Sequence, residues 1–154
     1  MNVRQAYNVW ADDYDTVENK TRDLEVKVLR ESIFGDKLDI LELGCGTGKN
    51  TAFLQTKVRH LVGADFSAEM LVKAGEKITA ENVEFCQLNV CEIWNFAEGS
   101  FDLITCSLAL ERIENIDFVF EQARKVLREN GHFHFGELHR FEQYLETEER
   151  FETG

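Results

Sequence analysis

The stretch Leu41-Glu42-Leu43-Gly44-Cys45-Gly46-Thr47-Gly48 decides the fold, because an apolar run passes directly into a loop with glycine at every second position. A helical pattern then resumes at about Lys49 and continues to Lys57. Glycine lets the backbone turn sharply and approach a ligand closely, and the first turn of a helix offers free N–H groups. A strand, a glycine loop and a helix in this order predict a ligand-binding turn.

An acid follows this loop at the distance that a nucleoside site requires. Asp65 lies 21 residues after Gly44, at the end of the next strand-like run, where a carboxylate can accept hydrogen bonds from both ribose hydroxyls. The loop has the spacing G-x-G-x-G, whereas a pyrophosphate-binding loop has G-x-G-x-x-G. Glu42 adds a negative charge just before the glycines, which suits the ammonium and sulfonium of S-adenosylmethionine (SAM) better than a pyrophosphate.

Strand and helix patterns alternate along the chain. Helices are predicted over Asp23–Phe34, with Asp23 as N-cap, over Lys49–Lys57, after the N-cap Ser67 to Ile78, and over Ile116–Glu129, where Asn130-Gly131 ends the helix. Strands are predicted over Leu38–Leu43, His60–Asp65, Val83–Val90, Phe101–Ser107 and His132–Leu138. This alternation predicts an α/β fold with a doubly wound, mostly parallel sheet of about five strands and helices on both faces.

Composition and charge narrow the range of partners. The chain has 154 residues and a net charge of −12, with no concentration of Lys and Arg in the sequence. Nucleic-acid binding depends on neutralising phosphates, so we expect no nucleic-acid partner. No apolar run approaches the roughly 20 residues that cross a membrane, and no signal peptide is evident, so we expect a cytoplasmic protein without a membrane partner.

Several segments resemble the class I SAM-dependent methyltransferases that act on small molecules. Leu41–Thr51 resembles the first motif of that family, and Trp10-Ala11-Asp12-Asp13-Tyr14-Asp15 is similar to its aromatic lead-in. Phe101–Glu111 resembles the fourth strand and its loop, and Val126–Gly131 the turn before the fifth strand. The resemblance implies a Rossmann-like fold, SAM as cofactor and methyl transfer to a small-molecule nucleophile.

The resemblance also implies the residues that contact the cofactor. Gly44, Cys45 and Gly46 would run along the methionine part, Asp65 would take the ribose, Phe66 and Met70 would flank the adenine, Asn89 and Val90 would meet its edge, Cys106 and Leu108 would pass under the methionyl group, and Tyr14 would close over it. Three positions depart from the family pattern: Asn89 replaces a common Asp, Arg112 a frequent His, and Glu129-Asn130 the usual Pro-Gly.

The predicted organisation is one SAM-binding domain over residues 1–154. It comprises an N-terminal lid segment (1–22), a Rossmann-like core (23–139) and an acidic tail (140–154). Because the family usually has two further strands after the fifth, we expect a chain truncated at its C-terminal side. The strand edge left unpaired favours a homodimer.

The sequence assigns no catalytic residue, and Glu111, after the fourth strand, is the nearest candidate for a general base. His132, His134 and His139 are expected in the core or along the pocket, and no metal site is expected. Two alternatives remain open: a SAM-binding module or partner-dependent subunit without catalysis of its own, and an NAD(P)-dependent oxidoreductase. The glycine spacing and the lack of a Tyr-x-x-x-Lys pair disfavour the oxidoreductase.

Overall fold

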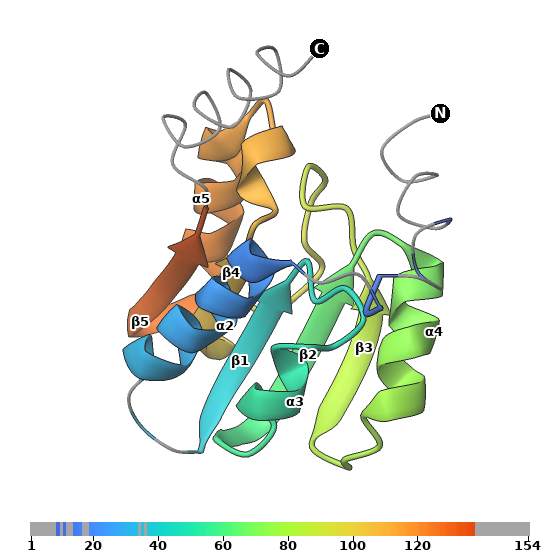
Figure 1. Cartoon of the computed structure of the whole chain (residues 1–154). Coiled ribbons are helices and arrows are strands. Elements are labelled where there is room, and N and C mark those ends of the chain that lie inside the picture. The colour runs from blue at the N-terminus through green and yellow to red at the C-terminus, as the bar shows by residue number, and fades with distance from the viewer. Residues whose placement is uncertain are drawn as a thin grey trace.

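A single parallel sheet forms the centre of the molecule. The computed structural model describes residues 9, 11, 14–16, 19–33, 35 and 37–137. Its strands are β1 (Leu38–Leu43), β2 (Val58–Asp65), β3 (Val83–Gln87), β4 (Phe101–Ser107) and β5 (Leu127–Gly136), in the order β3-β2-β1-β4-β5 (Figure 1). The chain leaves β1 toward β2 on one side, and β4 lies on the other. Ligands bind beyond the carboxyl ends of the strands at such a switch point.

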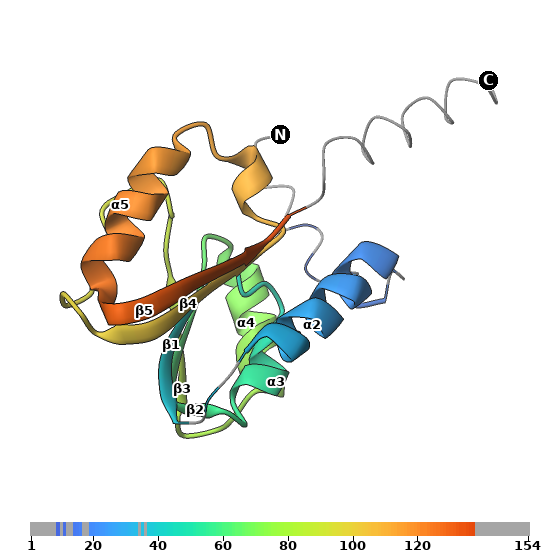
Figure 2. The same cartoon turned by 90° about the vertical axis from the view of Figure 1, so that its left-hand side faces the viewer.

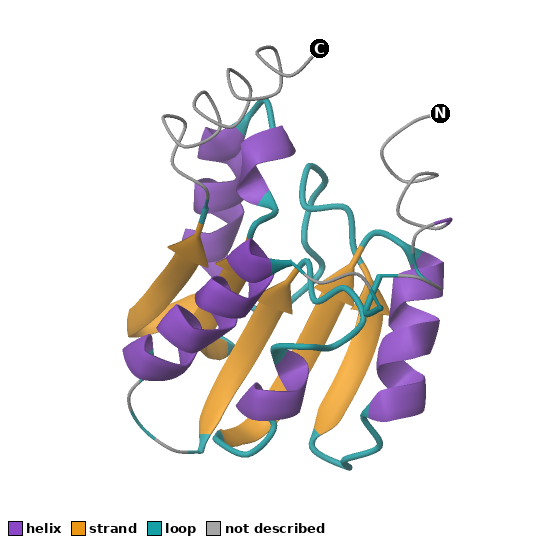
Figure 3. Ribbon diagram, viewed as in Figure 1, coloured by secondary structure: helices purple, strands orange, loops and turns teal. Residues whose placement is uncertain are grey.

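Helices cover both faces of this sheet, as predicted. The helices α2 (Lys20–Ser32), α3 (Thr51–Leu54) and α4 (Ala68–Lys77) lie on one face, and α5 (Ile116–Val126) lies on the other (Figure 2). A short 3-10 helix, η1 (Leu110–Arg112), precedes α5. Along the chain, helices separate successive strands except between β3 and β4, which a loop connects (Figure 3). The doubly wound α/β fold is confirmed. No helix in the described ranges is both long enough and apolar enough to span a bilayer.

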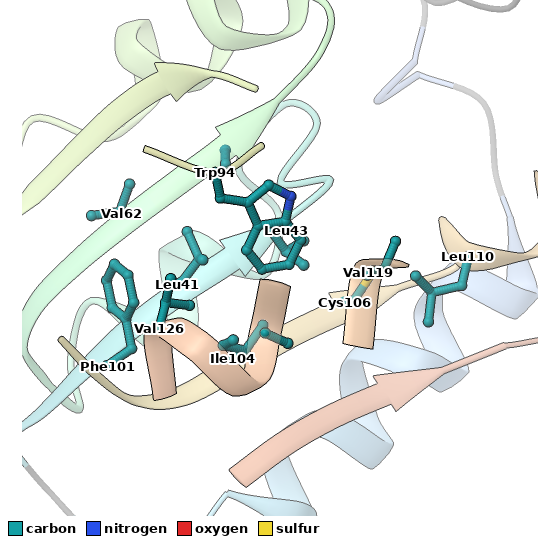
Figure 4. Close-up of a cluster of buried hydrophobic side chains, with 12 residues drawn as sticks. Leu41, Leu43, Val62, Trp94, Phe101, Ile104, Cys106, Leu110, Val119 and Val126 are labelled. Carbon is teal, nitrogen blue, oxygen red and sulfur yellow. The ribbon is translucent and has the colours of Figure 1, made fainter. Parts of the chain in front are cut away.

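Each face of the sheet has its own apolar cluster. Trp94, 1% exposed, packs with Leu41, Leu43 and Ile104 of the sheet and with Val119 of α5 (Figure 4). A smaller cluster on the opposite face joins the sheet to α3 through residues that are all buried: Ile40, Leu54, Leu61 and Leu103. Burying both faces of β1 explains why four of its six residues are apolar, with one acid near each end of the strand.

The two helices nearest the glycine loop differ from their predicted bounds. Asn19, and not Asp23, caps α2, because its side-chain oxygen accepts a hydrogen bond from the Arg22 N–H at 3.0 Å. The predicted helix over Lys49–Lys57 is a helix only at Thr51–Leu54. It ends early because Gln55 and Thr56 side chains donate to the carbonyls of Ala52 and Phe53, which competes with further helix formation.

The turn Asn130-Gly131 does not end a helix. Helix α5 ends at Val126, and Leu127 already pairs with Phe101 in the sheet. Asn130, with φ 64°, lies inside a bulge of β5, where the register with β4 shifts. Strand β3 also ends earlier than predicted, at Gln87, and β5 ends at Gly136. Most of the predicted lid segment and all of the acidic tail lie outside the described residues.

Candidate functional site

A cavity of about 290 Å³ opens at the carboxyl ends of the central strands. All eleven residues that the sequence proposed as cofactor contacts line it: Tyr14, Gly44, Cys45, Gly46, Asp65, Phe66, Met70, Asn89, Val90, Cys106 and Leu108. They come from segments distant in the sequence, which the sheet order brings together. The cavity therefore has the lining that the resemblance implies, and the role of each residue in binding remains a prediction.

The glycine loop forms one wall of the cavity and needs its glycines for two reasons. Gly44 and Gly46 have φ values of 68° and 54°, in the left-handed region that side chains disfavour. A Cβ at Gly44 would also lie 3.1 Å from the Cβ of Ala109 in the loop after β4. The Gly44 N–H donates to the Ala64 carbonyl at 2.8 Å, which fixes the loop against the end of β2.

Asp65 ends β2 and is buried beside the glycine loop. Its Oδ2 accepts a hydrogen bond from the Gly46 N–H at 2.9 Å, and its Oδ1 accepts one from the Ser67 N–H at 2.9 Å. Burial raises the pKa of Asp65, although these backbone hydrogen bonds oppose the increase. Each carboxylate oxygen has a second lone pair, so Asp65 can still accept from two hydroxyls in the cavity.

Glu42 lies beneath this loop and is the most deeply buried acid of the site. Burial raises its pKa to about 8, and the carboxylates of Asp65 and Glu25 add to the increase, while a hydrogen bond from Thr51 opposes it. The Thr51 hydroxyl donates to Glu42 Oε2 at 2.6 Å. A carboxyl group with this pKa holds its proton at neutral pH.

The described part of the N-terminal segment is fastened to the loop. The Thr47 hydroxyl donates to Asp15 Oδ1 at 2.7 Å, and Lys77 of α4 forms an ion pair with Asp15 and donates to the Thr47 carbonyl at 3.1 Å. Tyr14 consequently lies near Gly46, 4.0 Å from where a Cβ would stand. The Arg22 guanidinium lies over the Tyr14 ring, 4.2 Å from its centroid. This arrangement places Tyr14 on the wall of the cavity.

Asn89 lines the cavity, but its side chain also shapes the turn after β3. Its Oδ1 accepts from the Cys91 N–H at 3.1 Å, and its Nδ2 donates to Glu92 Oε1 at 2.9 Å. Phe66 is positioned by its carbonyl, which accepts from Gln87 Nε2 at 2.9 Å. Met70 of α4 is buried and also lines the cavity.

The loop after β4 is held in place by β5 and by Glu137, an acid to which the sequence assigned no role. Leu108, with φ 56°, donates through its N–H to the Gly136 carbonyl at 2.8 Å. Glu137 Oε1 accepts from the N–H groups of Ala109 and Leu110 at 2.9 and 2.7 Å. Burial raises the pKa of Glu137, and these two hydrogen bonds oppose the increase.

Helix α2 contributes cavity residues that sequence reasoning missed, namely Arg22, Glu25 and Val26. Glu25 is only 7% exposed. A signal for it was available, because Glu25 lies four residues before the buried Leu29 and therefore on the same helical face. An acid on the apolar face of a predicted helix indicates a polar group aimed into the protein.

The other candidates do not line the cavity. Glu111 is exposed on η1, and neither His132, which is exposed, nor His134, which is half-buried, borders the cavity. His139 lies outside the described residues. Within the described ranges, no three His, Cys, Asp or Glu side chains are placed to hold a metal ion.

Comparison with known proteins identifies the family. A family model described as a methyltransferase domain matches residues 41–135, which is more than half of the chain. The chain belongs to this methyltransferase family. A demethylmenaquinone methyltransferase from Lactococcus lactis is 32% identical over 140 residues, a match that covers 84% of this chain and 55% of the relative. The chain thus spans little more than half the length of that relative.

Solved structures give the same answer for the fold. A SAM-dependent methyltransferase from Mesorhizobium loti matches with a TM-score of 0.69 and 27% identity, covering 73% of this chain and 53% of that one. The structure of a DhpI–SAM–HEP complex matches with a TM-score of 0.77 and 25% identity, covering 94% of this chain and 68% of that one. The resemblance to class I SAM-dependent methyltransferases is confirmed.

Proposed function

We propose that this methyltransferase chain binds SAM in the cavity beside the glycine loop and transfers its methyl group to a small-molecule nucleophile. The cavity carries the proposal, since the glycine loop, Asp65 and Tyr14 enclose one space at the switch point of the sheet. The positions of the polar groups suit a nucleoside with a cationic tail. Asp65 keeps free lone pairs for the ribose. Glu25 on the cavity wall and Glu42 beneath it are the acids nearest to where the cationic part would lie.

In this mechanism SAM supplies an already activated methyl group, so the protein mainly positions the reactants. Asp65 would orient the ribose, and the backbone of Gly44 and Gly46 would lie along the amino-acid end. Tyr14, held through Asp15 and Lys77, would limit the access of water from one side. No described residue on the cavity wall is assigned as a general base, and an acceptor that is already nucleophilic needs none.

A small-molecule acceptor is supported by charge and by relatives. The net charge of −12 opposes binding to a phosphate backbone. The similar protein from Lactococcus lactis is named for a methyl acceptor of low molecular weight, demethylmenaquinone. The proposal therefore places the acceptor among small organic molecules and not among nucleic acids.

The test is a calorimetric titration with S-adenosylhomocysteine, with NAD as the control ligand. We expect saturable binding of S-adenosylhomocysteine and none of NAD. Asp65→Ala should weaken binding by about 100-fold, because two charge-assisted hydrogen bonds to the ribose are lost. Binding of NAD instead would contradict the proposal and favour the oxidoreductase.

A partner-dependent methyltransferase is the second candidate. Strand β5 pairs only with β4 among the described strands, and Phe135 on this strand is 49% exposed. An open strand edge beside an exposed aromatic side chain suits association with another chain, including a second copy of this one. Methyl transfer by the purified chain alone would exclude a required partner of a different kind.

A further inference from the structure

The wall of the cavity beneath α2 holds hydrogen-bond acceptors that no group of the described protein satisfies. Glu25 Oε1 and Asn50 Oδ1 are both buried and lack a hydrogen-bond partner within the described part of the chain. Both residues line the cavity. An acceptor that is buried without a donor is destabilising, and more so when it is charged, so these two atoms call for a donor that the described chain does not supply.

The orientation of the Asn50 amide follows from its neighbours. Asn50 Nδ2 donates to Ser107 Oγ at 3.2 Å and approaches Glu25 Oε2 at 3.5 Å. The reverse orientation would set the amide oxygen against a carboxylate oxygen. The free atoms of the pair are therefore both oxygens, one from Glu25 and one from Asn50.

The fold makes room for the Glu25 carboxylate at this place. Gly136, at the end of β5, has no side chain, and a Cβ there would lie 2.7 Å from Glu25 Oε1. Glu25 is 7% exposed, although burying a carboxylate with one oxygen unsatisfied is costly. Helix α2 is tied to the glycine loop by the ion pair between Asp23 and Lys49, which holds Glu25 at the cavity wall.

From these contacts we propose that Glu25 and Asn50 form a binding site for an ammonium group at the β4–β5 end of the cavity. Two unsatisfied acceptors call for a ligand with several N–H donors, and the carboxylate selects a cation. The inference rests on the proposed function for its two sources of ammonium: the amino-acid end of the cofactor, or an amine acceptor.

Calorimetry with two cofactor fragments tests the first source. S-adenosylhomocysteine carries the amino-acid end, and 5′-methylthioadenosine lacks it. If the cofactor supplies the ammonium, Glu25→Gln should weaken S-adenosylhomocysteine binding by about 10- to 100-fold and leave methylthioadenosine binding within about twofold. Glu31→Gln, which removes an exposed charge from the same helix, is the matched control and should change neither affinity.

Ligand-observed NMR with n-butylamine, and with 1-butanol as its neutral comparator, tests the second source. If an acceptor amine occupies the site, the wild-type protein, free or loaded with S-adenosylhomocysteine, should bind butylamine and not butanol, and Glu25→Gln should lose this preference. Gly136→Ala keeps the carboxylate but displaces it, and should reproduce the Glu25→Gln pattern for whichever ligand responds.

The outcomes separate the two proposals. A Glu25→Gln protein that matches the wild type with all four ligands overturns the ammonium site. A wild-type protein that binds neither adenosine compound overturns the proposed function, while the amine experiment on the free protein still decides the role of Glu25.

Discussion

Strand β1 carries one acid near each end, and the two acids have opposite properties. Burial raises the pKa of Glu42, at the carboxyl end, to about 8. Near the amino end, hydrogen bonds from Arg59 and Arg128 lower the pKa of Asp39 to about 2, although burial opposes this decrease. The two residues are three positions apart in one strand and are both buried.

The difference lies in the partners that the fold provides. Asp39 Oδ1 accepts from Arg59 Nε at 2.8 Å, and Asp39 Oδ2 accepts from Arg128 at 2.7 Å. Arg128 also pairs with Asp102 at 2.7 Å, so the amino end of the sheet is closed by a complete ion-pair network. At the carboxyl end Glu42 has a hydroxyl partner in Thr51 and two acids nearby. At the amino end of β1 the ion pairs stabilise the fold, whereas at its carboxyl end the acids can supply negative charge to a cationic ligand.

The largest expected effect comes from removing the acid at the carboxyl end. Because the folded state holds a proton on Glu42 up to about pH 8 and the unfolded state releases it near pH 4.5, stability should fall as pH rises between these values. Glu42→Gln should abolish this loss and raise the free energy of unfolding at pH 8 by about 2–4 kcal/mol, with little change at pH 4.5. Urea denaturation across this pH range measures both effects. A variant that is less stable than the wild type at pH 8 would show that Glu42 is not held in an unfavourable state.

Removing the acid at the amino end should have a smaller effect of opposite sign. The lowered pKa of Asp39 stabilises the fold above about pH 3.8, and this stabilisation is lost as pH falls through about 2. Asp39→Asn should lower the free energy of unfolding at pH 7 by about 1–2 kcal/mol, since the arginine partners are partly exposed and their interactions are screened. The same denaturation series, extended to pH 2, should show the two proteins converging. Equal stability at pH 7 would mean that the arginines contribute nothing through Asp39.

The smallest effect on stability is expected at Asp15, an acid whose side chain is partly exposed beside the glycine loop. Burial alone would raise the pKa of Asp15, but hydrogen bonds from Lys77 and Thr47 lower it. Asp15 and Lys77 side chains are 41% and 44% exposed, so Asp15→Asn should cost only about 0.5 kcal/mol of stability. Its effect should appear instead as weaker S-adenosylhomocysteine binding, because Tyr14 loses its attachment to the glycine loop. Unchanged affinity by calorimetry would show that the position of Tyr14 does not depend on Asp15.

Local sequence patterns predicted the fold well, and they failed where contacts between residues far apart in the sequence determine the structure. The alternation of elements and the Ser67 cap were predictable, because each depends on neighbours in the chain; Ser67 Oγ accepts from the Met70 N–H at 3.2 Å. The end of α5 was not predictable. Leu127 leaves the helix to pair with Phe101, and Arg128 reaches Asp39 and Asp102. Nothing in the local sequence reveals these partners.

The residues of the candidate site fall into the same two groups, those that local patterns predict and those that depend on distant contacts. Gly44 and Asp65 were found because motif spacing and strand position specify them. The position of Glu25 on the apolar face of α2 could be read from the sequence, but its role was missed because it depends on how α2 packs near the ends of β4 and β5. Gly136 was missed because its importance is the space that it leaves for Glu25. The role of a residue that depends on how two elements pack can be recognised only in the structure.

The protonated state of Glu42 has a consequence for how a cation enters the cavity. At neutral pH a proton neutralises this acid, and the positive charge of an arriving ligand would favour its release. Glu42 then loses its proton when the cationic ligand binds, so ligand binding is coupled to proton release. The apparent affinity for a cationic ligand would rise with pH until about 8, by at most tenfold per pH unit. The heat of binding would depend on the buffer that takes up the proton.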